Sequence, residues 1–368
     1  MIERLYVNNF RCLENFSLDL AGRSSALLIG KNGCGKSTVS KALELLQSIC
    51  RQGARIGKRI TPADFTRHQS DRPMRFALEF VVDSSRLEYT FALDWPPGFH
   101  EARIVDEKLT ADGQVQFTRQ QGQVRLADGN EFGLDWHVFA LPVIRERQGR
   151  SILQNVKSFL ATMIVVAPDP TQMSGYSREP TTELEYNAAN YTSCLRALLD
   201  RKPAAYGIFE SYIKTVLSDF SSIENVDHGD AGTQLVVEFK HGDPVCGLPV
   251  GFQALSDGEK CFFLSAYIIA ANAVGNATVC VWDEPDSHLS LPEVGHFITS
   301  LRKMACQRGQ FIATTHHPET IRRFSDDSTF VLSRTSHLDP VTVRPLADLN
   351  YQGDLVHALL RDEIISRQ

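Results

Sequence analysis

The chain lacks the features that mark membrane-spanning and exported proteins. Its longest strongly apolar stretch, residues 261–274, is too short to cross a bilayer and contains Ser265 and Asn272. Sustained heptads are absent, which excludes long coiled-coil arms. The first residues, 1–5, are not typical of a signal or transit peptide. We therefore expect a cytoplasmic protein that does not insert into a membrane.

Paired cysteines and an excess of positive charge are also missing. The eight cysteines are scattered singly, without a Cys-x-x-Cys pair, which is typical of reduced thiols and not of a disulfide frame or a zinc site. The net charge of −6 argues against a protein that coats nucleic acid, although it is compatible with a local basic patch. A chain of 368 residues can bury a large core in two or three lobes.

Residues 30–37 read Gly-Lys-Asn-Gly-Cys-Gly-Lys-Ser, which is a complete phosphate-binding loop. An apolar run at residues 26–29 predicts a buried parallel strand before it, and residues 39–49 carry apolar side chains at helical spacing after it. The glycines allow backbone N–H groups to face phosphate oxygens, and the helix adds its positive dipole end. We expect Lys36 to reach the β- and γ-phosphates and Ser37 to hold Mg²⁺. The residues assigned to ATP in this segment are Gly30, Asn32, Gly33, Gly35, Lys36, Ser37 and Thr38.

A second segment with anion-binding character spans residues 251–260 and precedes a long apolar helix. Ser256, with Glu259 three residues later, has the capping-box pattern of a helix start. The same Ser-x-Gly turn, from Ser256 to Gly258, is a device that presents backbone N–H groups to an anion. The two interpretations are compatible, because a capped helix still presents those N–H groups.

Two further strands end in polar side chains that suit phosphate chemistry. The apolar run at residues 277–282 leads into Asp283 and Glu284, and the run at residues 311–315 leads into His316. Asp283 suits a Mg²⁺ partner bound through water, and Glu284 suits a base that orients the attacking water. His316 could touch the γ-phosphate. A solvated acidic turn and a structural histidine are the alternatives, and the pattern as a whole favours the functional interpretation.

The order of these motifs resembles that of the ABC-type ATPases, and within them the SMC/RecF-like class. Residues 9–11, Asn-Phe-Arg, are similar to the N-terminal motif of that class, and residues 283–289 resemble the Asp-Glu-Pro-x-x-x-Leu of stand-alone RecF-like and OLD-like ATPases. The resemblance covers residues 1–55 and 245–335. It implies an α/β fold, an ABC-type P-loop NTPase head with a mixed core sheet, an antiparallel β lobe and an inserted helical lobe.

The resemblance also assigns roles to individual residues. Ser256 and Gly258 match the signature motif, which in this class acts on the ATP of the partner subunit. His316 matches the switch histidine, Asp283 matches the metal-site aspartate, and Arg11 matches a residue that approaches the nucleotide. ATP is the implied substrate, Mg²⁺ the implied cofactor, and a homo-oligomer, at least a dimer, the implied assembly.

The sequence departs from the family pattern in three places. Asp257 stands where transporter subunits usually have glycine, and His317 replaces the serine that often follows the switch histidine. The glutamine that usually couples Mg²⁺ to the inserted lobe is not identifiable. Gln69 is the best candidate for this metal-site role, and Gln47 is a poor one because it falls inside the predicted helix.

Turn and strand patterns predict three parts along the chain. Residues 1–145 are expected to form the first ATPase lobe, with the phosphate loop and an antiparallel β subdomain. Residues 146–245 are expected to form the helical insertion lobe, and residues 246–368 the rest of the ATPase core with a short C-terminal helix. Within the β subdomain, a hairpin is predicted around residues 83–85, and a last short strand at residues 136–139.

A regulatory ATPase is the function that these motifs favour. We expect a dimer that hydrolyses ATP and controls a separate effector, such as a nuclease or a toxin, in DNA transactions or anti-phage defence. OLD-like relatives carry a C-terminal Toprim nuclease, and too few residues follow His316 for such a domain. The alternatives are a RecF-like repair clamp that binds DNA itself, and a nucleotide-switch scaffold that scarcely hydrolyses ATP. Residues 51–72, here called the basic connector, could contact DNA phosphates or be solvated.

Overall fold

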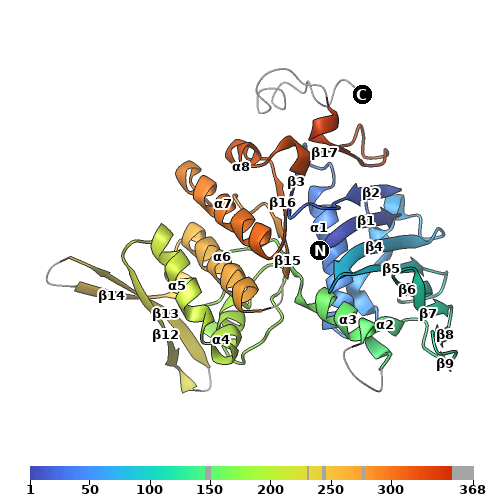
Figure 1. Ribbon diagram of the computed structural model, residues 1–368, viewed down its shortest axis with the longest axis horizontal. Helices are drawn as coiled ribbons and strands as arrows, with labels where there is room; N and C mark the ends of the chain where they lie inside the picture. The colour runs from blue at the N-terminus through green and yellow to red at the C-terminus, as the bar shows by residue number, and fades with distance from the viewer. Residues whose placement is uncertain (146–150, 230–231, 243–245, 276–277, 350–368) are drawn as a thin grey trace. The chain divides into compact units, whose positions relative to one another are not determined.

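Two units make up the chain, and each has strands and helices of its own (Figure 1). The computed structural model describes residues 1–145, 151–229, 232–242, 246–275 and 278–349. Unit 1 combines Met1–Met163 with Phe324–Gln368, and unit 2 is Ile164–Arg323. The short helix expected at residues 353–365 lies outside the described residues. The lobe boundaries expected after residues 145 and 245 stay predictions.

An antiparallel sheet of eight strands, in the order β2-β1-β4-β5-β6-β7-β8-β9, is the larger sheet of unit 1 (Figure 1). Its strands are β1 (Ile2–Asn8), β2 (Phe16–Asp19), β4 (Met74–Val82), β5 (Ser85–Asp94), β6 (Arg103–Ala111), β7 (Gln114–Gln120), β8 (Gln123–Leu126) and β9 (Glu131–Gly133). The expected hairpin is confirmed, because Val82 pairs with Ser85. The two residues between them, Asp83 and Ser84, both have positive φ, as a type I′ turn requires.

One face of this sheet packs against helices. Alternation along β4 buries every second side chain from Met74 to Phe80. The helices of unit 1 are α1 (Lys36–Arg51), α2 (Ala140–Val143) and α3 (Ile152–Thr162). Phe80 stacks on Phe159 of α3 with ring centroids 4.7 Å apart, and Arg51 of α1 donates to the carbonyl of Ala161 in α3. These contacts fix α1, which begins at the phosphate loop, within the β lobe.

The strand expected at residues 136–139 is wrong. Buried side chains of β6 and β7 form hydrogen bonds with backbone groups of residues 138 and 140. A neighbouring strand would otherwise need such groups for pairing. Arg119 on β7 donates to the Val138 carbonyl, and Glu107 on β6 accepts the Ala140 N–H at 2.7 Å. A backbone group that is satisfied by a side chain is no longer available to a ladder. The segment therefore keeps a single isolated bridge and leads directly into α2.

Replacing Glu107 should lower stability strongly. Both Glu107 and Arg119 are fully buried, with Nη1 3.7 Å from Oε2, and the Tyr89 hydroxyl donates to Glu107 at 2.8 Å. Glu107→Gln should lower the free energy of unfolding by about 3–5 kcal/mol, because the guanidinium remains buried without its counter-charge. Chemical denaturation measures the change. Glu79→Gln, which removes the half-exposed partner of Arg4, should lower it by no more than about 1 kcal/mol, and equal losses would contradict this account.

The phosphate loop follows a buried strand, as its sequence predicts. β3 (Ser25–Ile29) is buried at every position and runs parallel to β17 (Thr329–Ser333). β17 pairs in turn with the antiparallel β18 (Thr342–Pro345). A parallel strand that is buried at every position is shielded on both faces. Parallel and antiparallel pairs therefore occur side by side, as expected of a mixed core sheet.

Among the described residues, unit 2 contains three parallel strands and most of the α-helices. Its parallel strands are β10 (Ile164–Val166), β15 (Thr278–Asp283) and β16 (Gly309–Thr315), with β15 paired to both others. Its helices are α4 (Tyr191–Arg201), α5 (Ala205–Val216), α6 (Asp257–Val274), α7 (Leu291–Gln307) and α8 (Pro318–Arg322). α6 is buried on most sides, as its apolar sequence predicts. Among the described residues, no helix combines the length and the apolar character that a membrane crossing requires.

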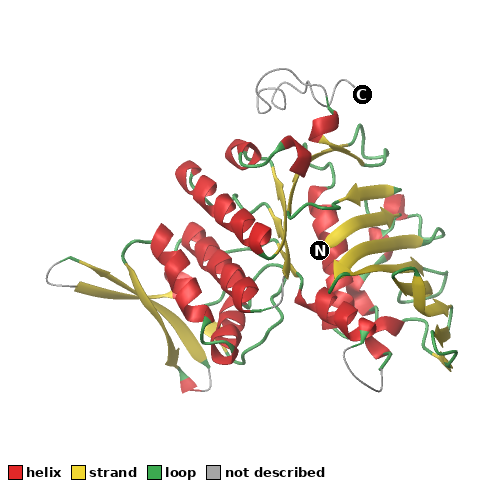
Figure 2. Cartoon of the chain, viewed as in Figure 1, coloured by secondary structure: helices red, strands yellow, loops and turns green. Residues whose placement is uncertain are grey.

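A second, antiparallel sheet of unit 2 lies beside these helices (Figure 2). Its strands are β11 (Tyr176–Ser177), β12 (Phe220–Asp227), β13 (Thr233–His241) and β14 (Cys246–Gly251). β13 is central, since it pairs with each of the other three. Only β13 has the alternation of apolar side chains that predicts a strand, and it buries Leu235 and Val237.

Candidate nucleotide site

The phosphate loop of unit 1 joins β3 to α1, and two of its glycines are needed for its shape. Gly30 and Gly35 have φ of 151° and 102°, a region that residues with a side chain rarely adopt. A Cβ at Gly30 would lie 2.3 Å from the carbonyl oxygen of Leu332 and 2.7 Å from Cys34 Sγ. α1 begins at Lys36, and among the described residues no side chain caps its start. The Thr38 N–H donates to the Gly35 carbonyl at 3.0 Å, and no described side chain competes with an anion for this helix start.

Lys36 folds back over the loop that precedes it. Its Nζ donates to the carbonyl oxygens of Gly30 at 2.8 Å and Lys31 at 3.3 Å, and only 6% of the residue is exposed. The ammonium group therefore lies against the loop, where the lysine of this motif meets phosphates. Ser37 is exposed next to it, and Thr38 is half-buried.

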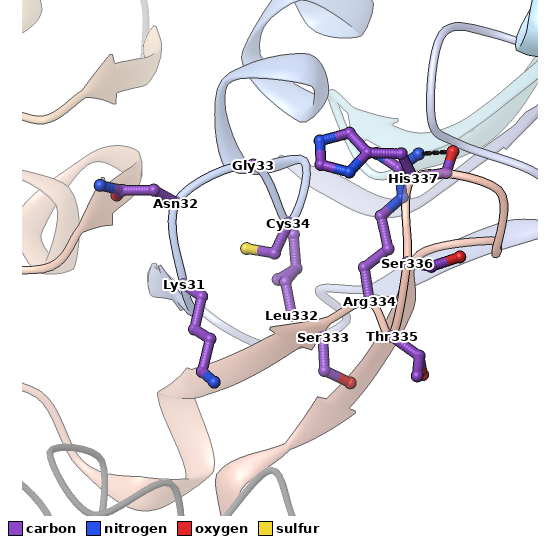
Figure 3. A pocket seen from close by; sticks show the side chains of 10 residues that line it. All are labelled: Lys31, Asn32, Gly33, Cys34, Leu332, Ser333, Arg334, Thr335, Ser336 and His337. Carbon is purple, nitrogen blue, oxygen red and sulfur yellow. Dashed lines mark hydrogen bonds between the residues drawn. The ribbon is translucent and has the colours of Figure 1, made fainter.

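A small cavity lies against the phosphate loop (Figure 3). It has a volume of about 120 Å³ and is lined by residues 31–34 and 332–337. Pockets for small molecules typically enclose about 300 Å³ or more, so this cavity alone does not accommodate a nucleotide. Asn32 and Gly33 line it and are exposed. Burial raises the pKa of the Cys34 thiol, which keeps the loop free of a negative charge that would repel phosphate.

Arg11 is held by partners within unit 1. Its Nε donates to Asp64 Oδ1 at 2.9 Å, and its backbone N–H donates to the Asp64 carbonyl at 2.6 Å. The guanidinium carbon also lies 5.5 Å from the ring centre of Phe10. Arg11 lines a cavity of about 260 Å³ together with residues 65–68 and 337–339. The structure thus places Arg11 beside a polar cavity, and its contact with a nucleotide stays a prediction.

The two glutamine candidates lie in different surroundings. Gln69 is exposed, and its backbone carbonyl accepts a hydrogen bond from Asn9 Nδ2 at 3.2 Å. Gln47 is buried in α1, where its Nε2 donates to the carbonyl of Met163 at 2.5 Å. Gln47 therefore has a structural partner, as its position inside the helix predicts. Gln69 as a residue that couples to Mg²⁺ stays a prediction.

The basic connector makes several contacts within unit 1. Arg55 pairs with Glu101, with Nε 2.9 Å from Oε2, and Arg67 pairs with Glu14. Arg59 donates to two backbone carbonyls, at 2.6 and 2.8 Å. These three arginines already have partners within the protein. This favours a structural role for the basic connector over a role in binding DNA phosphates.

The acidic residues at the end of β15 lie together with the switch histidine in unit 2. Asp283 is only 8% exposed and accepts a hydrogen bond from the Thr314 hydroxyl. The Glu284 N–H donates to the same hydroxyl at 3.0 Å, and Glu284 Oε1 lies 3.2 Å from His316 Nδ1. Because Asp283 is buried and bonded, a solvated acidic turn does not describe this segment. The structure brings Asp283, Glu284 and His316 into one cluster.

Several polar residues around this cluster were not predicted. Thr315 and Thr320 both donate to Oδ2 of Asp286, which is 2% exposed. His317 caps α8, because its Nδ1 accepts the Glu319 N–H at 3.2 Å. This capping role accounts for a histidine where the family often has serine, since both side chains can accept that bond. In the sequence, these hydrogen bonds to Asp286 are indicated only by the two adjacent threonines, Thr314 and Thr315, at the end of β16.

The signature turn begins α6 with a complete capping box. Ser256 Oγ accepts the Glu259 N–H at 3.3 Å, and Glu259 Oε2 accepts the Ser256 N–H at 2.8 Å. A Cβ at Gly258 would lie 3.0 Å from the carbonyl oxygen of His288, so glycine lets the loop after Glu284 approach closely. The capping interpretation is confirmed. The anion-binding role of Ser256 and Gly258 stays a prediction.

The side chains expected to hold Mg²⁺ are hard oxygen donors. The Asp283 carboxylate and the Ser37 hydroxyl offer the oxygen atoms that Mg²⁺ prefers. Within the described ranges, no group of three or more His, Cys, Asp or Glu side chains could hold a metal ion. Mg²⁺ usually keeps several waters and binds through one or two carboxylates and the phosphates of a substrate. Each of these two side chains therefore has donor chemistry that suits Mg²⁺, and their joint use with ATP stays a prediction.

Comparisons with known proteins match two long segments of the chain. A family model described as "AAA ATPase domain" matches residues 1–94. A second, described as "AAA domain, putative AbiEii toxin, Type IV TA system", matches residues 150–322. A search of curated proteins found no match. The two matched segments contain the phosphate loop and the Asp283–Glu284 pair, respectively.

Solved SMC head domains are similar in structure. One, bound to the C-winged helix domain of ScpA, is 16% identical, covers 94% of this chain and 98% of its own, and has a TM-score of 0.56. Another, derived from Pyrococcus furiosus, has an extended coiled coil and is bound to the C-terminal domain of ScpA. It is 15% identical, covers 94% of this chain and 96% of its own, and has a TM-score of 0.55. The expected fold, an ABC-type P-loop NTPase head, is confirmed. The chain thus has the fold of an SMC head, and two of its segments match models of AAA-type ATPase domains.

Proposed function

We propose that the chain is a regulatory ATPase, which hydrolyses ATP with Mg²⁺ in a head-to-tail dimer and controls a separate effector protein. The observation that carries the proposal is the cluster of Asp283, Glu284 and His316, in which Glu284 Oε1 lies 3.2 Å from His316 Nδ1. A carboxylate in contact with an imidazole, next to a buried aspartate, suits a site that orients a water molecule for attack on a phosphate. The phosphate loop with Lys36 supplies the anion site that this chemistry needs.

Each residue has a defined task in the proposed reaction, in which ATP and water give ADP and phosphate. Lys36 and the first N–H groups of α1 bind the phosphate oxygens. Glu284 accepts a hydrogen bond from the attacking water and orients it, and His316 holds the Glu284 carboxylate in place or touches the γ-phosphate. Mg²⁺, which Ser37 and Asp283 would hold, stabilises negative charge on the phosphates when it is bound.

The form of the signature turn supports a dimer. Ser256 is exposed, and Glu259 engages both its hydroxyl and its N–H, so the turn is rigid before any ligand arrives. A rigid helix start that faces solvent can bind a phosphate group of a nucleotide that is held by another molecule. In the SMC/RecF-like class that molecule is a second copy of the chain. Each site would then combine the phosphate loop of one copy with Ser256 and Gly258 of the other.

A family model and two solved SMC heads support a separate effector. The family model that matches residues 150–322 is described with a toxin of a type IV toxin–antitoxin system, and the SMC heads were solved bound to ScpA domains. Two solved heads of this fold are thus bound to a domain of another protein. The partner of this chain would be a nuclease or a toxin that acts in DNA transactions or anti-phage defence. Hydrolysis would release the dimer and so change the state of that partner.

Ser256→Arg tests the dimer together with the ATPase activity. The variant should bind ATP normally and lose hydrolysis, because the arginine obstructs the turn that serves the other copy. Mixed with Lys36→Ala, it should regain part of the activity. A mixed dimer would place both lesions in one composite site and leave the other site intact. Steady-state phosphate release, measured for each variant and for the mixture, gives the result.

Loss of the helix cap is the competing explanation for any defect in Ser256→Arg. Cap removal should destabilise the protein by about 1 kcal/mol without impairing hydrolysis. Ser151→Arg is the matched control, because Ser151 caps α3 by accepting the Gln154 N–H at 3.1 Å. The control should show a similar stability loss and normal turnover. Normal hydrolysis in Ser256→Arg, or no recovery on mixing, would contradict the head-to-tail dimer.

A further inference from the structure

The Thr314 hydroxyl, at the end of β16, touches both acidic residues of the proposed catalytic cluster. It donates to Asp283 Oδ1 and accepts the Glu284 N–H at 3.0 Å. The direction of both bonds is fixed, because an N–H can only donate and an ionised carboxylate can only accept. Thr314 is fully buried, so water does not replace either bond. One hydroxyl therefore links the carboxylate of Asp283 to the backbone of Glu284.

The backbone of Glu284 needs this support. Its φ is +52°, in the left-handed region that a residue with a side chain seldom adopts. The Glu284 N–H is shared between the Thr314 hydroxyl and the Thr314 carbonyl oxygen, at 3.0 and 3.2 Å. The turn that results directs the Glu284 side chain towards His316 Nδ1 and the Ser287 hydroxyl, at 3.2 and 3.3 Å. Strained backbone held in this way at a functional site fixes the direction of a side chain.

The two oxygens of Asp283 have different partners. Oδ1 accepts from the Thr314 hydroxyl, and the Tyr186 hydroxyl lies 3.5 Å from Oδ2, at the limit of a hydrogen bond. The bond from Thr314 stops the carboxylate from rotating about its Cβ–Cγ bond. Oδ2 is consequently the oxygen that is less tightly held and better able to meet a water ligand of a metal ion.

Thr315, the next residue, provides an internal comparison. It is also fully buried, and its hydroxyl also combines one donated and one accepted bond. Its partners are different, because it donates to Asp286 Oδ2 at 2.5 Å and accepts the His317 N–H at 2.8 Å. Thr314 and Thr315 thus have the same chemistry and the same burial, but only Thr314 bonds to the two residues assigned to metal and water.

We propose that Thr314 is a positioning residue for the reaction, and that its hydroxyl sets Asp283 for Mg²⁺ and Glu284 for the attacking water. The inference rests on the proposed ATPase function. Without the hydroxyl, Asp283 can rotate, and the Glu284 N–H keeps only the Thr314 carbonyl. Loss of an outer partner of a metal-site residue typically weakens metal affinity or activity by about 10- to 100-fold.

The test compares Thr314→Val with Thr314→Ser and Thr315→Val. Valine keeps the shape of threonine without the hydroxyl, and serine keeps the hydroxyl. Calorimetry measures ATP affinity in EDTA and at increasing Mg²⁺, and steady-state kinetics measures the Mg²⁺ concentration for half-maximal turnover. In Thr314→Val we expect unchanged ATP affinity in EDTA. We also expect the Mg²⁺ requirement to rise by about 10-fold or more and kcat to fall by about 10- to 100-fold.

The other two variants separate positioning from a merely structural role. Thr314→Ser should return the Mg²⁺ requirement to within about threefold of the wild type. Thr315→Val should lower the melting temperature about as much as Thr314→Val and leave the Mg²⁺ requirement unchanged. A Thr314→Val protein with wild-type Mg²⁺ dependence would overturn the inference and leave the ATPase proposal standing. A wild-type protein whose ATP affinity and turnover ignore Mg²⁺ would overturn both.

Discussion

Lys36→Ala should lower ATP affinity by more than about 100-fold. The ammonium group lies against the phosphate loop, where it is expected to bond to the β- and γ-phosphates at the same time. Hydrogen bonds to charged groups contribute about 1.5–3 kcal/mol each, and about 1.4 kcal/mol corresponds to a tenfold change in affinity. Two such bonds therefore account for at least two orders of magnitude. Calorimetry with ATP and Mg²⁺ on folded protein measures the loss.

Lys41→Ala is the matched control for this prediction. Lys41 belongs to the same helix, is about one-third exposed, and has its ammonium 3.8 Å from Glu44. Its removal should leave ATP affinity unchanged. Equal losses in the two variants would point to damage of α1 rather than to a lost phosphate contact. Unchanged affinity in Lys36→Ala would refute the assignment of residues 30–37 to the nucleotide.

The phosphate loop and the β lobe could be predicted because their physics is local. Glycines at fixed spacing before Lys36 are needed wherever backbone N–H groups must converge, and the structure shows the required positive φ at Gly30 and Gly35. The alternation along β4 and along the first part of β5 likewise indicates which face of the sheet is buried. In both cases neighbours along the chain carry enough information to define the element.

The elements that the sequence did not predict depend on distant partners. β12 contains Ser222, Glu224 and Asn225, which are poor strand formers, and it exists because β13 offers it a ladder. The segment at residues 136–139 alternates like a strand, yet Arg119 and Glu107 bind its backbone and that of the following residues. Neither side chain can be identified as a partner from the local pattern. Tertiary contacts therefore override the local preference.

In the candidate site, too, some features could be predicted from the local sequence and others depend on distant residues. Asp283, Glu284 and His316 could be predicted because each follows an apolar strand, and the ends of parallel strands meet at one edge of a sheet. The bonds that hold them could not be predicted, because nothing in the local sequence shows that the Thr314 hydroxyl meets the Asp283 carboxylate and the Glu284 N–H. The pairing of Arg11 with Asp64 was also missed, because 53 residues separate them in the sequence.

Glu284→Gln should keep ATP bound and slow its hydrolysis by about 100-fold or more. Glutamine preserves the shape of the side chain but cannot accept a proton from, or polarise, the attacking water, and general-base catalysis typically contributes about 10²- to 10⁴-fold. The backbone bonds of residue 284 to Thr314 do not involve the side chain and should persist. Single-turnover phosphate release and calorimetry together separate slow chemistry from weak binding.

The same variant tests whether ATP joins two copies of the chain. If hydrolysis normally opens a head-to-tail dimer, Glu284→Gln should form an ATP-dependent dimer that outlives the wild-type one, which light scattering detects. Glu319→Gln is the control, because Glu319 of α8 pairs with Arg323, just after that helix, and its replacement should leave turnover and dimer lifetime unchanged. Turnover at the wild-type rate would remove Glu284 from the role of base. Slow turnover in a protein that stays monomeric with ATP would keep that role and reject the dimer, because the chemistry would then be complete within one chain.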